Sequence, residues 1–158
     1  MMNIDSLTIH LCAVVREDLV GQERLYVALE SQEQAVLGHD PEALEKATIL
    51  VADQLEASAL RSTKRARLVR TFADHFGVAG GTVTLGSIAA RLGESGQQLS
   101  ELRLELRDLA ERVMAKNRRV SALISMHRNV TNEILETVLA DGEGNPIHER
   151  GVLLDAEA

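Results

Sequence analysis

The sequence predicts an all-α protein: an antiparallel bundle of three long helices, with a short helix between the second and third and a flexible C-terminal tail. The apolar fraction is 45 %, yet the aromatic residues are only Tyr26, Phe72 and Phe76, whereas β-sandwiches and barrels favour aromatic and β-branched residues. Apolar residues recur with the 3.6-residue period of a helix in three long segments. Glycine and proline, which interrupt helices, fall mostly between these segments.

The first predicted helix spans residues 3–37, where apolar residues such as Leu7, Leu11 and Leu25 follow the helical period. Gly38 suits the left-handed position that often ends a helix. Asp40 can cap the next helix, with Pro41 at its first position. Because so short a junction joins neighbouring elements, we expect the first two helices to lie antiparallel.

The second predicted helix spans residues 41–76, and its apolar stripe fades in the middle. Leu44 and Val51 begin the stripe and Phe72 continues it, but Ser58 and Ser62 stand where large apolar residues would be expected. The sequence therefore predicts weaker packing at the centre of this helix, or a place that another surface completes.

Glycines at 77–81 end the second helix, and an apolar piece at 85–92 predicts a short helix. The third long helix, at 97–140, follows a heptad pattern in which nine of twelve a and d positions are large and apolar. These positions are, in order, Leu99, Leu102, Leu106, Leu109, Val113, Lys116, Val120, Leu123, His127, Val130, Ile134 and Thr137. At 1.5 Å per residue this helix would be about 65 Å long, so the two shorter helices cannot cover all of it.

The predicted domain organisation is a single helical domain at 1–140 followed by a mobile tail at 141–158. The tail contains Gly142, Gly144 and Pro146 and shows little apolar periodicity.

Composition restricts the compartment and the partners. The formal net charge is −7, which disfavours binding to nucleic acid because phosphate neutralisation supplies most of that affinity. A helix-turn-helix-like stretch at 84–104 has no net charge, so DNA binding is the less favoured reading. Cys12 is the only cysteine, and no apolar run approaches the length of a membrane span. We therefore expect a cytoplasmic protein without membrane insertion.

No catalytic or metal motif is present, so the sequence predicts neither an enzyme nor a cofactor. None of the five histidines has a glutamate three residues before it, as di-iron bundles require. His127 occupies an a position, where a buried polar residue commonly fixes register. Cys12 is interpreted as a small buried hydrophobe. The basic residues of 61–70 indicate a solvated helix face, with an anion site as the alternative.

Four stretches carry a family resemblance: residues 25–50, Thr84-Leu85, the run Lys116-Asn117-Arg118-Arg119-Val120-x-x-Leu123-Ile124 and the polar residues 141–145. Together with the layout of a long helical hairpin, a short helix and a long C-terminal helix, they resemble the FlgN family of flagellar export chaperones. The resemblance implies a cytoplasmic chaperone in type III protein export for flagellum biogenesis. Such a chaperone would hold the terminal helices of hook-associated proteins and pass them to the flagellar export gate.

The apolar surface of the third helix provides a groove of the kind that amphipathic segments bind. Residues from Leu99 to Leu109 are expected in the core, and those from Val113 to Ile134 are expected to contact the partner. The predicted partner-binding residues are Val113, Met114, Asn117, Val120, Leu123, Ile124, Val130 and Ile134. The alternative is a coiled-coil structural or interaction protein whose third helix pairs with its own copy to form a homodimer.

Overall fold

The computed structural model describes residues 3–143, and the helical prediction is confirmed. The elements are α1 (Ile4–Leu37), α2 (Pro41–Phe76), the 3-10 turn η1 (Gly80–Thr82), α3 (Leu85–Leu92), the 3-10 turn η2 (Gly93–Gly96) and α4 (Gln97–Glu143). Within the described residues no strand occurs. The predicted tail lies mostly outside them, since 144–158 are not described and α4 continues to Glu143.

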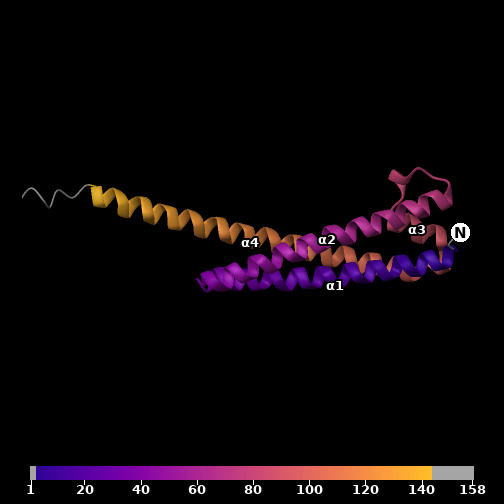
Figure 1. Cartoon of the computed structure of the whole chain (residues 1–158), viewed down its shortest axis with the longest axis horizontal. Coiled ribbons are helices and arrows are strands. Elements are labelled where there is room, and N and C mark those ends of the chain that lie inside the picture. The colour runs from indigo at the N-terminus through magenta and orange to yellow at the C-terminus, as the bar shows by residue number, and fades with distance from the viewer. Residues whose placement is uncertain (1–2, 144–158) are drawn as a thin grey trace, which may run out of the picture. The chain divides into compact units, whose positions relative to one another are not determined.

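Helices α1 and α2 form an antiparallel hairpin, as their short junction predicts (Figure 1). Asp40 caps α2 as expected, because its carboxylate accepts a hydrogen bond of 2.9 Å from the Ala43 amide. The left-handed residue of the turn is His39, with φ of 54°, whereas Gly38 has φ of −80°. The expectation that Gly38 would take the left-handed conformation is therefore wrong.

The core draws on all four α-helices. At one end of the bundle, Leu11 of α1, Phe72 of α2, Ile88 of α3 and Leu99 of α4 are fully buried in one apolar cluster. A second cluster joins α1, α2 and α4 through residues that include Leu25, Leu29, Val51, Leu109 and Val113. The N-terminal part of α4 packs on the N-terminal part of α1, and more C-terminal residues of α4 pack on more C-terminal residues of α1. These two helices therefore run parallel.

The middle of α2 packs weakly, as its sequence predicts. Between Val51 and Phe72, every residue of this described segment is partly or fully exposed. Leu55 is 54 % exposed and Ser58 is half-buried. The fading apolar stripe thus leaves the centre of α2 with few buried apolar contacts.

The chain divides into two compact units, one ending at Val120 and the other starting at Ser121, although α4 is continuous across the boundary. The length of α1 explains why the first unit ends there. Lys116 of α4 lies beside Glu33 of α1, and α1 ends at Leu37, one helical turn later. Val120 lies one turn after Lys116, so it is the last α4 residue that α1 can cover. Among the described residues no helix is long and apolar enough to cross a membrane.

Gly96 allows the start of α4 to approach the end of α3. A Cβ atom at this position would overlap the backbone carbonyl of Ala89, whereas a Cβ at Gly80 would meet open space. We expect Gly96→Ala to lower the free energy of unfolding by about 1–3 kcal/mol, because neither backbone can move aside cheaply. Gly80→Ala should change it by less than about 0.5 kcal/mol. Chemical denaturation of both variants checks this, and equal stability of the two would contradict the close approach.

Candidate functional site

An open apolar groove of about 320 Å³ lies in the first unit between α2 and α4, with α1 at its base. We call it the α2–α4 groove. It forms where the middle of α2 packs weakly, and Leu55 and Met114, which line it, are each 54 % exposed. Its lining residues are Gln22, Leu25, Leu29, Val51, Leu55, Ser58, Ala110, Val113, Met114 and Asn117. Small side chains at Ser58 and Ala110 leave room for a further apolar side chain or helix.

The second unit carries an apolar surface of its own, which we call the C-terminal stripe. Val130, Ile134 and Val138 are 49 %, 58 % and 62 % exposed. They succeed one another at spacings of four residues, and Leu123 precedes Val130 by seven, so all lie on one side of α4. Met126 is also more than half exposed and adjoins these residues, since it precedes Val130 by one helical turn. Leu135 and Leu139 are more than half exposed as well, but they lie toward the other side of the helix. So large an exposed apolar surface on a helix is typical of a binding site.

The structure divides the eight predicted partner-binding residues into two that are buried and six that are at least partly exposed. Val120 is 1 % exposed and belongs to the packed interior of the first unit, so it is not open to a partner. Val113 is only 7 % exposed, although it lines the α2–α4 groove. Both positions are more buried than expected, because α1 covers α4 as far as Val120. Of the other six, Met114 and Asn117 line the α2–α4 groove. Leu123 and Ile124 are half-buried, and Val130 and Ile134 belong to the C-terminal stripe.

A charged cluster holds α4 on α1 next to Val120, and we call it the α1–α4 clasp. The buried carboxylate of Glu33 accepts a hydrogen bond of 2.6 Å from Lys116 Nζ, and Arg119 Nε lies 2.5 Å from its other oxygen. The Tyr26 ring adds a cation–π contact, with Lys116 Nζ 5.3 Å and Arg112 Cζ 5.0 Å from its centroid. Lys116 and Arg119 therefore attach α4 to α1.

The clasp makes the stability of the first unit depend on pH. The hydrogen bond from Lys116 lowers the pKa of Glu33 below its ordinary 4.5, so the carboxylate stabilises the fold above that pH and loses this effect as the pH falls through the folded pKa. The same bond raises the pKa of Lys116 above 10.5, so the ammonium stabilises the fold until the pH rises through its folded pKa.

We expect the free energy of unfolding of the native chain to fall between pH 5 and pH 3, and Glu33→Gln to reduce this fall, as measured by urea denaturation. Glu30→Gln is the matched control, because Glu30 is half exposed and lies 4.0 Å from Lys116. The assignment of the acid dependence to Glu33 would be contradicted if Glu33→Gln lost as much stability between pH 5 and pH 3 as the native chain. An equal reduction of that loss in Glu30→Gln would contradict it as well.

A second charged cluster joins α1 to the middle of α2. The buried carboxylate of Asp18 pairs with Arg65, and Arg61 Nε lies 3.5 Å from its other oxygen. Lys64 reaches the exposed Glu17 at 2.9 Å. The interpretation of residues 61–70 as a solvated face is therefore wrong for Arg61 and Arg65, which hold α2 against α1. Burial lowers the pKa of Arg65, because the charged guanidinium loses hydration. The carboxylate of Asp18 compensates for this loss by pairing with the guanidinium.

The other residues discussed as candidates from the sequence are Cys12, His127 and those of the helix-turn-helix-like stretch. Cys12 is buried, as predicted, and burial raises the pKa of its thiol, which disfavours the reactive thiolate. His127 is exposed, so the prediction that it is buried is wrong. In the helix-turn-helix-like stretch, Gln97 donates a hydrogen bond of 3.2 Å to Glu101 within α4. Among residues 3–143, no group of three or more metal-ligating side chains is placed to hold an ion.

The arrangement as described offers two apolar surfaces for binding, the α2–α4 groove in the first unit and the C-terminal stripe in the second. Both suit the apolar face of a helix, which recognises such surfaces through side chains spaced three, four and seven residues apart. No protein-family model, no curated protein and no solved structure matches this chain.

Proposed function

We propose that this protein binds an amphipathic helix of another protein through the C-terminal stripe, as a cytoplasmic chaperone for flagellar protein export. The observation that carries the proposal is the exposure of the stripe. Four large apolar side chains, those of Met126, Val130, Ile134 and Val138, are about half or more exposed along one side of a regular helix. Covering each of them would contribute roughly 1 kcal/mol, since complete burial of such a side chain contributes about 1.5–3 kcal/mol.

The client class follows from the resemblance to the FlgN family. Its clients would be the terminal helices of hook-associated proteins, which the chaperone would keep in the cytoplasm until they reach the export gate. A segment that is disordered when free and helical when bound suits a long, regular stripe, because it can align many apolar side chains along it.

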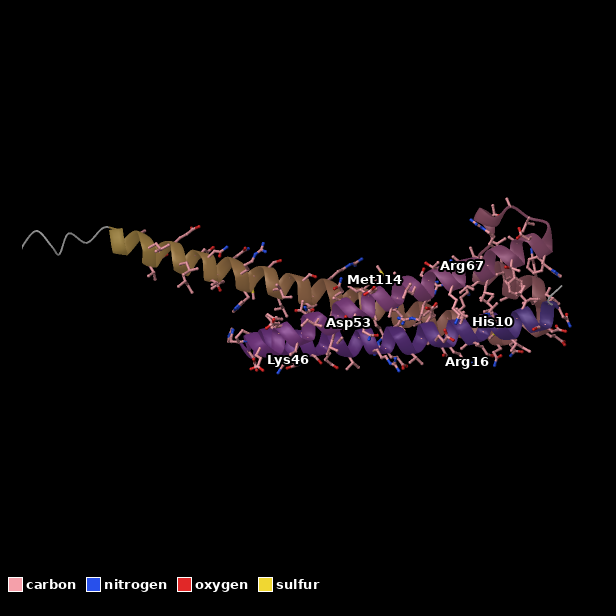
Figure 2. All side chains as sticks on the ribbon, in the orientation of Figure 1. His10, Arg16, Lys46, Asp53, Arg67 and Met114 are labelled. Carbon is pink, nitrogen blue, oxygen red and sulfur yellow. The ribbon has the colours of Figure 1, made fainter. Side chains whose placement is uncertain are left out.

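The α2–α4 groove supports the same proposal with a second apolar surface. Its exposed wall residues, Leu55 and Met114, come from different helices and face a shared cavity. The flexible side chain of Met114 can adapt to different apolar partners. Figure 2 labels Met114 on the part of α4 that belongs to the first unit.

Light scattering coupled to size exclusion tests the proposal against self-association, which the heptad pattern would also support. The chain alone should have the mass of a monomer, 17.2 kDa, and should form a complex of one-to-one stoichiometry with a hook-associated protein of the same organism. A stable homodimer that does not take up this client would instead support the coiled-coil alternative.

A further inference from the structure

A second groove lies on the hairpin of α1 and α2 and is not used by the proposed client site. Two cavities of about 550 Å³ and 430 Å³ adjoin there, because both are lined by Val20 and Arg24. All their lining residues belong to α1 or α2. We call the combined feature the hairpin groove. One of its ends is cationic and the other is apolar.

The cationic end is formed by Arg16, Arg24 and Arg61. Arg61 lies across Gly21, where any Cβ atom would overlap its guanidinium group. This guanidinium shares the single negative charge of Asp18 with Arg65. In the described part of the chain, Arg16 and Arg24 are exposed and form no ion pair. Glu17 also lines this end, but it pairs with Lys64. The end therefore keeps the positive charges of Arg16 and Arg24, although the chain as a whole is acidic.

The apolar surface of the other end comes from Val20 and Val27 of α1 and Leu50 of α2, which are 46 %, 59 % and 50 % exposed. Polar side chains, among them that of Glu23, also line this end. Val20 and Val27 are seven residues apart, so they lie about 10.5 Å apart along one face of the helix. A partner helix lying along the groove could match this distance of about 10.5 Å with two of its own side chains that are seven residues apart. A small anion could satisfy the arginines but would leave the apolar end uncovered.

We propose that the hairpin groove is a docking site for an acidic amphipathic helix of a partner protein. Two apolar side chains of that helix, seven residues apart, would cover Val20, Val27 and Leu50. Aspartate or glutamate residues beside them would pair with Arg16 and Arg24, in charge-assisted hydrogen bonds of the kind that arginine forms with carboxylates. The positive charge of the groove selects acidic helices, since the acidic remainder of the chain repels them.

The test uses the full chain and a fluorescent synthetic helix built from alanine and glutamate, with two leucines seven residues apart. Anisotropy should show saturable binding that weakens as salt is raised. The double variant Arg16→Glu with Arg24→Glu should bind roughly tenfold or more weakly. Arg67→Glu with Arg70→Glu is the matched control, because it changes the charge equally at exposed residues outside the groove. Figure 2 shows Arg16 and Arg67 at opposite edges of the bundle in this view.

The control variant should bind as the native chain does, and so should Val130→Asp with Ile134→Asp, which alters only the C-terminal stripe. Three outcomes would each overturn the proposal: no saturable binding of the acidic peptide, equal affinity for a peptide with lysine in place of every glutamate, or equal loss of binding in the control. Loss of binding in the stripe variant would likewise assign the peptide to the stripe and overturn the hairpin groove.

Discussion

Asp18→Ala is expected to lower the free energy of unfolding by about 3 kcal/mol or more, because removing one partner of a buried ion pair leaves the other charge uncompensated. Here two guanidinium groups, those of Arg61 and Arg65, would lose their shared carboxylate. The arginines are partly exposed, so the effect should lie at the lower end of the usual range of about 3–5 kcal/mol. A domain held together by about 5–15 kcal/mol would melt roughly 10 °C lower. Calorimetry or thermal circular dichroism measures the change.

Glu17→Ala provides the matched control for this prediction. Glu17 is next to Asp18 and pairs with Lys64, but both side chains are about half exposed. Surface pairs of this kind contribute at most about 1 kcal/mol. Comparable melting temperatures for the Asp18 and Glu17 variants would show that the buried cluster does not hold the hairpin together.

Val130→Asp combined with Ile134→Asp is expected to weaken client binding at least about a hundredfold while the helical fold is retained. Each substitution places a carboxylate where the partner's apolar side chains would lie, and burying such a group unpaired costs several kcal/mol, out of about 8 kcal/mol for a micromolar complex. Both residues are about half or more exposed in the free chain, so the change costs the fold little beyond the lower helix propensity of aspartate. Titration calorimetry with a hook-associated protein, together with circular dichroism, measures both effects.

Ser121→Asp combined with Ser125→Asp is the control for the stripe. It adds the same charges at the same spacing, to exposed residues on the opposite side of α4. Client binding should stay within a few fold of that of the native chain. If both double variants lose binding alike, the effect comes from added charge, and the stripe is not the contact surface.

The sequence predicts the helices and most of their limits because the signals involved are local. Asp40 and Pro41 start α2 through hydrogen bonding and backbone preference that depend on neighbouring residues alone. The fading stripe around Ser58 also predicts the weakly packed middle of α2, because apolar periodicity depends directly on which residues can be buried.

The charged clusters could be anticipated only in part. Asp18 interrupts the apolar face of α1, and Lys116 occupies a d position, and a charge at either place signals a buried partner. The partners themselves, Arg61 and Arg65 in one cluster and Glu33 in the other, come from 43 to 83 residues away in the sequence. Local patterns contain no information at that separation.

The limits of the candidate site depend on how α4 is aligned along α1, which the heptad pattern of α4 does not specify. Val113, Val120 and Val130 all fall on the apolar stripe of α4, yet the first two are buried and the third is exposed. Where the burial stops depends on how far along α1 the α4 helix begins, which the turns at 77–96 and the close approach at Gly96 determine. Sequence periodicity identifies the face of the helix, and tertiary packing decides how much of it is covered.

Amide hydrogen exchange across residues 121–140, with and without a hook-associated protein, tests the role of the C-terminal stripe most directly. In the free chain these residues should exchange quickly, because their helix has few buried apolar contacts to oppose local opening. Binding of a client helix should slow exchange most strongly around Val130 and Ile134. Formation of the complex without any added protection in residues 121–140 would contradict the assignment of the stripe as the client site.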